Sequence, residues 1–280
     1  MRFIFKLLPQ LKETSFLELA LMNKVISNRF NLELKVKMYK TDLHDTIIPS
    51  KDPANIKISI EGNIACGKSE IVEALKELTD HLSTPARIYQ EPVDEWTAVG
   101  NKRTNLLKEF YETRSAFKLQ VQCFRSLASI HAELNRGFGK GKRGFSIMER
   151  SVHSSRLIFQ KHLSDCYDLS SCEQTILDGL FMLLKQNMDL ELDAIIYVRT
   201  MPNVCFERSK LRGRSEEKSI ALVELEELHQ LHEKWLNPIE FSKDPAGVEV
   251  VYRPRSIFII DGEKSRSEIK ETLRKFLIQA

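Results

Sequence analysis

One short segment, residues 62–69, constrains the fold of this 280-residue chain more than any other. Its sequence GNIACGKS fits the pattern GxxxxGK[S/T], in which two glycines bracket a loop that ends in lysine and serine. The apolar run IKISI at 56–60 precedes it, and a helical pattern over about 67–82 follows. Such a loop between a strand and a helix turns backbone N–H groups toward an anion. The segment therefore predicts nucleoside triphosphate binding, with a decayed, non-binding loop as the alternative.

Short apolar segments alternate with helical patterns along the rest of the chain. Further strands are expected at 86–90, 144–148, 194–198 and 256–260, and helices at 103–135, 151–163, 172–188, 202–212, 219–236 and 265–278. Strands that alternate with helices predict an α/β fold with a five-stranded parallel sheet covered by helices on both faces.

Composition narrows the classes of partner. The net charge of +3 is too small to argue for a nucleic-acid or membrane partner, and no run of 18 apolar residues could span a bilayer. The five cysteines contain no CxxC pair. That pattern argues for reduced thiols in an intracellular compartment and against a disulfide framework or a zinc site.

The first residues differ in composition from the remainder. Residues 1–52 are expected to form an N-terminal extension. Its first 30 residues are basic and poor in acids, which suggests either a mitochondrial transit peptide or an accessory segment. A mitochondrial location follows from the first reading and a cytoplasmic one from the second. The segment PSKDPAN at 49–55 is expected to be a linker into a main domain that spans 53–280.

Charged residues gather at the ends of the expected strands, where ligand sites of α/β proteins form. Glu91 follows one strand and precedes a proline, so its carboxylate is a candidate general base, although a surface loop glutamate is the plain alternative. Glu149 follows another strand, where a carboxylate meets a metal ion, and Arg150 beside it could steady phosphate charge.

A run of cations lies between two expected helices, within FERSKLRGRSEEKSI at 206–220. Such a run is usually a solvated face. In a nucleotide-binding chain, however, a cationic segment interrupted by a glycine is typical of a lid that closes over phosphates and excludes water. The lid prediction rests on Arg208, Lys210, Arg212, Arg214 and Lys218.

Five motifs in order, GNIACGKS, EPVDEW, ERSVHSSR, RGRSEE and LHQLHEKWL, resemble the deoxyribonucleoside kinase family over about residues 55–278. The pattern is similar to that of the mitochondrial thymidine kinases and the insect multisubstrate enzymes. The resemblance implies a P-loop kinase fold with an Arg-rich lid, Mg²⁺ as cofactor, and a homodimer. It also implies transfer of a phosphoryl group from ATP to the 5′-hydroxyl of a deoxyribonucleoside, in nucleotide salvage.

Matching positions imply roles for single residues. The catalytic group would be Glu91, Arg150 and Lys68, and Mg²⁺ would be held by Ser69 and Glu149. The resemblance assigns ATP and its phosphates to Gly62, Asn63, Ile64, Ala65, Cys66, Gly67, Lys68, Ser69, Arg208, Arg212 and Arg214. It assigns the nucleoside to Ile64, Glu91, Val93, Trp96, Leu107, Phe110, Tyr111, Val121, Gln122, Ser129, Arg150, Ser155, Phe159 and Glu217.

Departures from the family pattern bear on the base. Ser129 and Ser155 occupy positions where deoxycytidine and deoxyguanosine kinases carry an arginine–aspartate pair, which leaves room around the base and favours pyrimidines such as thymidine and deoxycytidine. Val121 replaces an aromatic residue that would sandwich the base against Phe159. The loss of one stacking face, worth roughly 0.5–1.5 kcal/mol, affects affinity and base choice but not the chemistry.

Two alternatives remain at this point. A nucleoside-monophosphate kinase fits the loop and the lid but gives no reason for a base at Glu91, and an inactive structural relative would not need Lys68, Ser69, Glu149 and Arg150 intact. The histidines of LHQLH, His229 and His232, are expected at the surface or an interface.

Overall fold

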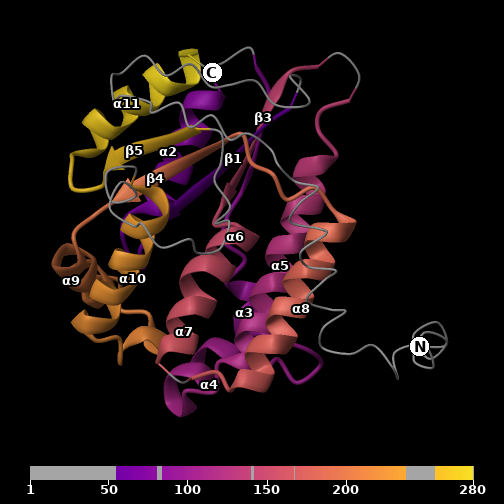
Figure 1. The fold of residues 1–280 in the computed structure, drawn as a ribbon. Helices are drawn as coiled ribbons and strands as arrows, with labels where there is room; N and C mark the ends of the chain where they lie inside the picture. Colours follow the sequence, from indigo (N-terminus) through magenta and orange to yellow (C-terminus); the bar gives the residue numbers. More distant parts are fainter. Residues whose placement is uncertain (1–54, 81–83, 140–141, 167, 238–255, 280) are drawn as a thin grey trace, which may run out of the picture. The chain divides into compact units, whose positions relative to one another are not determined.

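The computed structural model describes residues 55–80, 84–139, 142–166, 168–237 and 256–279 (Figure 1). The expected N-terminal extension lies outside the described residues, as does the expected linker except for its last residue. That residue, Asn55, already belongs to the first strand.

Five parallel strands form one sheet in the order β2-β3-β1-β4-β5. Their bounds are β1 Asn55–Gly62, β2 Ala86–Tyr89, β3 Gly144–Glu149, β4 Ala194–Arg199 and β5 Ser256–Asp261. The chain leaves β1 toward β2 on one side and reaches β4 and β5 on the other, so the connections reverse direction around the central strand β1. In open α/β sheets the ligand crevice lies at this reversal, outside the carboxyl ends of the strands.

Apolar side chains cover both faces of the sheet, as its parallel strands require. Ile58, Ile60 and Ile196 pack against the helices α2, Lys68–Thr79, and α11, Arg266–Gln279. On β4, the alternate residues Ile195 and Tyr197 belong instead to a second core on the other face. Successive residues of a strand point to opposite faces, so an uninterrupted apolar strand supplies both cores at once.

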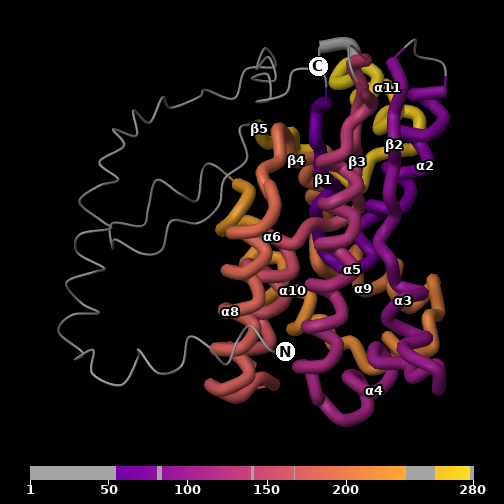
Figure 2. The backbone as a smooth tube through the Cα atoms, turned by 90° about the vertical axis from the view of Figure 1, so that its right-hand side faces the viewer, coloured from indigo at the N-terminus to yellow at the C-terminus, as the bar shows by residue number. Residues whose placement is uncertain are grey.

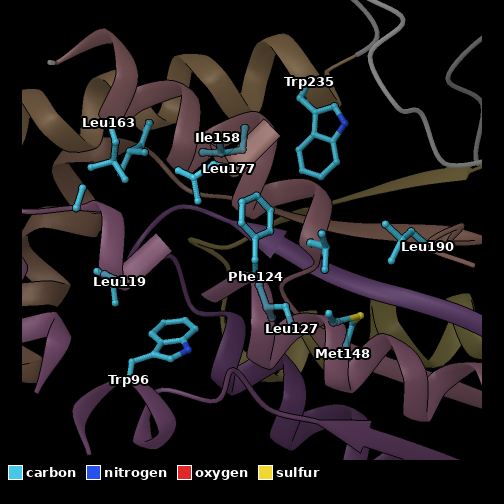
Figure 3. Packing of buried hydrophobic residues seen from close by; sticks show 14 of the residues in the cluster. Trp96, Leu119, Phe124, Leu127, Met148, Ile158, Leu163, Leu177, Leu190 and Trp235 are labelled. Carbon is cyan, nitrogen blue, oxygen red and sulfur yellow. The ribbon is translucent and has the colours of Figure 1, made fainter. Parts of the chain in front are cut away.

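The second core lies mainly among helices. Figure 3 shows Phe124 at its centre, with Ile158 and Leu177 on one side and Leu127 on the other. The helices that build this side are α3 Asp94–Thr97, α4 Leu106–Thr113, α5 Phe117–Asn135, α6 Val152–Ser154, η3 Ser155–Gln160, α7 Lys161–Asp165, α8 Ser171–Asn187 and α10 Leu222–Leu236. In Figure 2, α3 and α4 lie below the strands, on the same end as α9, Pro202–Arg212.

The expected long helix over 103–135 is wrong in one respect, because the structure divides it into α4 and α5. Arg114 ends α4 with a positive φ of 57°, and its N–H bonds to the Phe110 carbonyl. A residue in the left-handed region stops a helix, and the apolar periodicity continues across the break, so the pattern alone conceals it.

The expected helix over 151–163 also contains an irregularity. Residues Ser155–Gln160, η3, form a π-helical turn between α6 and α7. Such turns are rare and frequently mark functional sites. Two residues expected to contact the nucleoside, Ser155 and Phe159, lie on this turn.

His232 contradicts the expectation of a surface or interface position. Its side chain is fully buried, Nδ1 bonds to the Leu228 carbonyl at 2.7 Å, and burial lowers its pKa to about 3. It is therefore a neutral core histidine, stacked on Tyr197 with ring centroids 6.1 Å apart. Among the described helices, none is long and apolar enough to cross a membrane.

The N-terminus of α8 allows a test of local stability. Ser170 Oγ accepts a bond from the Glu173 N–H at 3.3 Å, and the Glu173 carboxylate accepts one from the Ser170 N–H at 2.8 Å. Because this capping box satisfies two helix-end donors, we expect Ser170→Ala to lower the free energy of unfolding by about 1 kcal/mol. Thermal denaturation measures it. Ser171→Ala, one residue on, is the control, and an equal loss in both variants would contradict the capping role.

Candidate active site

The loop at residues 62–69 leaves β1 and enters α2 with three positive φ angles, at Gly62, Ala65 and Gly67. A Cβ on Gly62 would lie 2.6 Å from the Val198 carbonyl oxygen, so only glycine fits between the loop and β4. Gly67 precedes the first residue of α2 in the left-handed region, at φ 105°. The loop therefore wraps the N-terminus of a helix, as a phosphate cradle requires.

Lys68 is buried inside this loop. Its Nζ donates to the Asn63 carbonyl at 2.8 Å and to the Gly62 carbonyl at 3.4 Å. Asn63 in turn ties the loop to α10, because its Nδ2 donates to the Leu225 carbonyl at 2.8 Å. The ammonium group is thus held at the loop by neutral carbonyls, and the Glu91 carboxylate is close enough to interact with its charge.

Two oxygen-bearing side chains meet at the start of α2. Ser69 Oγ donates to Glu149 Oε1 at 3.1 Å, and the other Glu149 oxygen accepts from the Glu91 N–H at 3.4 Å. A hydroxyl and a carboxylate beside a phosphate loop are hard oxygen ligands, the kind that Mg²⁺ prefers together with phosphate oxygens. The chemistry of this pair would suit a magnesium ion held near nucleotide phosphates.

Glu91 and Arg150 form an ion pair next to the loop. Arg150 Nε lies 2.5 Å from Glu91 Oε1, and Nη1 donates to the Gly62 carbonyl at 3.1 Å. Arg150 takes a left-handed backbone, φ 64°, and its N–H bonds to the Ile60 carbonyl at 3.0 Å. A strained residue held by its neighbours is typical of functional sites. The strain turns the guanidinium from the end of β3 back toward the loop.

The charge state of Glu91 follows from two opposing effects. Burial by itself raises the pKa of this carboxyl, but the charges of Arg150 and Lys68 outweigh it and hold the pKa below its ordinary value. The carboxylate is consequently ionised near neutral pH, as a general base must be before it can accept a proton.

The segment expected to be a lid contributes three arginines. Arg208 lies on α9 and its Nη1 donates to the Cys66 carbonyl at 3.3 Å, so it already touches the loop. Arg212 and Arg214 both pair with the carboxylate of Glu217, Arg214 at 2.6 Å. Glu217 therefore holds two lid arginines in this structure, across the glycine that ends α9.

Aromatic and apolar side chains of α3 and α4 pack together beside α5. Trp96 Nε1 donates to Ser126 Oγ at 2.9 Å, which fixes the buried indole against α5. Leu107 and Phe110 are buried on α4, and the rings of Phe110 and Tyr111 lie 4.9 Å apart. Burial, with Glu224 and Glu217 nearby, raises the pKa of Tyr111, so its hydroxyl keeps its proton and can donate.

The residue expected to read the base already has partners. Gln122 Nε2 donates to the Glu95 carbonyl at 3.0 Å, and Gln122 Oε1 accepts from Arg125 Nε at 3.1 Å. Arg125 also pairs with the Glu95 carboxylate at 2.6 Å. The amide of Gln122 is thereby oriented by α3 on one side and by its own helix on the other.

The remaining predicted residues have contacts of their own. Arg150 Cζ lies 4.4 Å from the centroid of the Phe159 ring, and Ser155 Oγ accepts from Gln120 Nε2 at 2.8 Å. Ser129 is exposed and donates to the carbonyl of Arg125. Ile64, Val93 and Val121 are among the half-buried side chains that pack against the second core.

Three residues that bear on the loop escape sequence reasoning. Thr200 Oγ1 donates to the Cys66 carbonyl at 2.9 Å, and the Gly262 carbonyl accepts from Arg208 Nη1 at 2.9 Å. Glu61, fully buried behind the loop, accepts from Ser151 Oγ at 2.6 Å, and burial raises its pKa. Of these three residues, only Glu61 could have been noticed in the sequence, because a charged residue inside an apolar strand is unusual.

The fold and this constellation define a P-loop protein whose phosphate cradle faces a carboxylate–arginine pair. Residues 58–279 match the deoxynucleoside kinase family, and the chain belongs to that family. It is 36% identical to human mitochondrial thymidine kinase 2 over 179 residues, 64% of this chain and 63% of that protein. It is also 36% identical to human deoxycytidine kinase over 198 residues, 64% and 75% of the two chains.

A third relative extends the matched region slightly. Deoxycytidine kinase 1 of Xenopus laevis is 34% identical over 208 residues, which cover 68% of this chain and 77% of that protein. The chain thus spans less than two thirds of the thymidine kinase 2 proteins it matches and about three quarters of the deoxycytidine kinases.

Gly262 provides a test of the loop's surroundings. A Cβ there would overlap Thr200 Oγ1 and lie 2.9 Å from the Cys66 carbonyl oxygen. Overpacking of this kind costs about 1–3 kcal/mol, and each 1.4 kcal/mol is about tenfold in affinity. Because the loop must shift to make room, we expect Gly262→Ala to weaken Mg·ATP binding at least about tenfold by calorimetry.

The matched control is Gly179→Ala on α8, where a Cβ meets nothing within 4 Å. Its affinity for Mg·ATP should stay within about twofold of the parent. Equal affinities in both variants and the parent would show that the contact between Gly262 and the loop does not shape the cradle.

Proposed function

We propose that this chain is an ATP-dependent deoxyribonucleoside kinase, which transfers the γ-phosphoryl group of ATP to a nucleoside 5′-hydroxyl. The observation that carries the proposal is the Glu91–Arg150 pair beside the loop, 2.5 Å between Nε and Oε1, with Arg150 also bonded to Gly62. A phosphate cradle alone implies only a nucleotide. An ionised carboxylate at the same crevice supplies what a neutral hydroxyl acceptor needs.

In this mechanism Glu91 accepts the proton of the 5′-hydroxyl as that oxygen attacks the γ-phosphorus. The bond from the γ-phosphorus to the bridging oxygen breaks and ADP leaves with its electron pair. Lys68, at the loop, and Arg150 stabilise the charge that spreads over the transferred group. Most of the rate acceleration comes from holding the two substrates in line, because phosphoryl transfer requires little covalent work from the protein.

Magnesium would be held by Ser69 and Glu149, whose oxygens already lie 3.1 Å apart. When bound, the ion neutralises phosphate charge. Arg208, Arg212 and Arg214 complete the proposed lid. In this structure Arg212 and Arg214 each use one nitrogen on Glu217, and their other N–H groups would clamp phosphate oxygens when the lid closes.

For the nucleoside, we assign the sugar 3′-hydroxyl to Tyr111 and Glu217 and the base edge to Gln122. Gln122 is oriented by Glu95 and Arg125, so its amide must exchange at least one of these bonds for the base. Phe159 offers one stacking face, and Val121 offers no ring opposite it. The small side chains at Ser129 and Ser155 favour pyrimidines, thymidine and deoxycytidine among them.

The remaining assignments concern the whole protein. We propose a kinase domain over 53–280 with its lid at about 206–220, a homodimer, and a mitochondrial location set by residues 1–52. A role in nucleotide salvage, as a supplier of DNA precursors, follows from the proposed product. These assignments rest on family membership and on the basic composition of the first residues.

One assay tests the proposal and its alternatives. The full chain is incubated with Mg·ATP and, separately, with each of the four deoxyribonucleosides and their monophosphates, and the products are quantified. We expect phosphorylation of the nucleosides, with the highest kcat/KM for thymidine or deoxycytidine. Turnover of monophosphates alone would instead identify a nucleoside-monophosphate kinase. No turnover despite ATP binding would support an inactive relative, and a purine optimum would overturn the base assignment.

Replacing the proposed base tests the mechanism. We expect Glu91→Gln to lower kcat by at least about 100-fold while ATP still binds, because the amide keeps the size of the side chain but cannot accept the proton. Asp94→Asn, at an exposed carboxylate in the same motif, is the control and should keep kcat within about twofold. A near-normal kcat for Glu91→Gln would show that Glu91 is not the general base.

The pH profile gives an independent check. Since Arg150 and Lys68 hold the pKa of Glu91 below 4.5, its carboxylate stays ionised as pH falls toward that value. The acid limb of kcat/KM that belongs to Glu91 should therefore lie below pH 4.5 in the parent. An acid limb that centres above pH 6 and disappears in Glu91→Gln would contradict the lowering of the Glu91 pKa by Arg150 and Lys68.

A further inference from the structure

A cluster of potential metal ligands links α7 and α10, two helices that pack against each other. Figure 1 labels both helices. His162 lies on α7 and Cys166 caps the C-terminus of that helix, four residues on. Glu227 comes from α10, and one donor atom from each of the three residues lies within 4.8 Å of the others. Residues four apart share a helix face, so α7 presents imidazole and thiol together toward α10.

Three of the separations between donor atoms are close to those around a tetrahedral zinc ion. Sγ of Cys166 also lies 3.9 Å from His162 Nε2, so the imidazole must turn before Nδ1 and the sulfur can bind one ion. His162 Nδ1 is 3.4 Å from Glu227 Oε2, Cys166 Sγ is 3.8 Å from Nδ1, and Sγ is 3.7 Å from the same carboxylate oxygen. Bonds of about 2.3 Å to sulfur and about 2.1 Å to nitrogen and oxygen place tetrahedral ligands about 3.6 Å apart for S···N and S···O and about 3.4 Å apart for N···O.

Hydrogen bonds among the three side chains are the alternative interpretation. Both sulfur contacts are long, at 3.7 and 3.8 Å, so the thiol makes at most weak bonds to the carboxylate and the ring. Three donors of the types that bind zinc therefore lie within 4.8 Å of one another without strong bonds among the thiol and its neighbours.

The surroundings of His162 support a metal at Nδ1. Its other ring nitrogen, Nε2, lies 3.9 Å from Glu224 Oε1, and Glu224 and Asp168 face Arg114 at 3.9 and 2.5 Å. Histidines that bind metals usually place their second nitrogen against a carboxylate, which orients the ring. Here Glu224 lies near that position, although 3.9 Å is too long for a hydrogen bond to Nε2, and Arg114 lies beside Glu224 at the same distance.

We propose that His162, Cys166 and Glu227 bind one Zn²⁺ ion, with the fourth position open to water at the exposed side of Cys166. Thiolate and imidazole select zinc over Mg²⁺, so this site is separate in chemistry and place from the Ser69–Glu149 pair. The absence of a CxxC pair concealed it from sequence reasoning, because Glu227 is 61 residues from Cys166.

The ion would fasten α10 to α7. α10 begins at Leu222, shortly after the lid segment, and its Leu225 carbonyl holds Asn63 of the phosphate loop. A metal that fixes this helix stabilises the framework between lid and loop. It stabilises the folded chain as any ligand of the native state does, by mass action.

Zinc binding to the metal-free full chain is the direct test, with metal content measured after gel filtration and affinity by competition with a chromophoric chelator. We expect one ion per chain in the parent and at least about tenfold weaker binding in Cys166→Ser and Glu227→Gln. Cys172→Ser is the matched control, since Cys172 is the other exposed thiol and has no place in the cluster. It should bind zinc like the parent.

Two further readouts locate the ion. Co²⁺ in place of zinc should give a thiolate-to-metal charge-transfer absorption in the parent and in Cys172→Ser but not in Cys166→Ser. Zinc should also slow alkylation of Cys166 at least about tenfold, by mass spectrometry, without slowing that of Cys172. Neither readout requires nucleoside turnover, so failure of this proposal is distinguishable from failure of the kinase assignment.

Each adverse result overturns the site. Binding of equal strength in the parent and in Cys166→Ser, or cobalt spectra without a thiolate band, would place any ion elsewhere. Loss of binding in Cys172→Ser would assign the thiol to a different cluster. An equal melting temperature of the parent with and without zinc would exclude a structural role for an ion between α7 and α10.

Discussion

Parallel pairing of β1 with β3 is the constraint on which the rest of the site depends. The register sets Ile60 opposite Glu149, so the strand that enters the phosphate loop lies beside the strand that ends in Glu149 and Arg150. The Arg150 N–H extends this pairing by one more bond, to the Ile60 carbonyl. A single ladder of backbone bonds thereby brings the loop, Glu149 and the Arg150 partner of Glu91 together at the strand ends where the sheet topology reverses.

The charged side chains at the phosphate loop are balanced by opposite charges close by. Glu91, Arg150, Lys68 and Glu149 would each be costly to bury alone, and together they compensate one another within the crevice. Glu61 behind the loop is the exception, since burial raises its pKa and its nearest partners are the hydroxyl of Ser151 and the charge of Arg150. The left-handed backbone of Arg150 belongs to the same arrangement, because local strain positions a charge that the strand direction alone would point elsewhere.

The helical side of the molecule shows where prediction from sequence succeeds and where it fails. Apolar periodicity located the strands and most helices to within a few residues, because one buried face imposes its spacing on the chain. It missed the break at Arg114, the π turn at Ser155–Gln160 and the burial of His232. Each of these depends on contacts with elements distant in the sequence, which a period of three or four residues does not record.

Sequence alone determined the class of the phosphate loop, the parallel sheet and the family, since a glycine-rich loop between strand and helix and five ordered motifs have few other readings. Tertiary structure decided which side chains face one another. Gln122 is oriented by Glu95 and Arg125, and Arg212 and Arg214 share Glu217. Thr200 and Gly262 contact the loop from the ends of β4 and β5. Likewise His162 and Cys166 meet Glu227 only because α7 packs on α10. The physical reason is the same in each case: spacing along a chain fixes the face of an element, and only packing selects its partner.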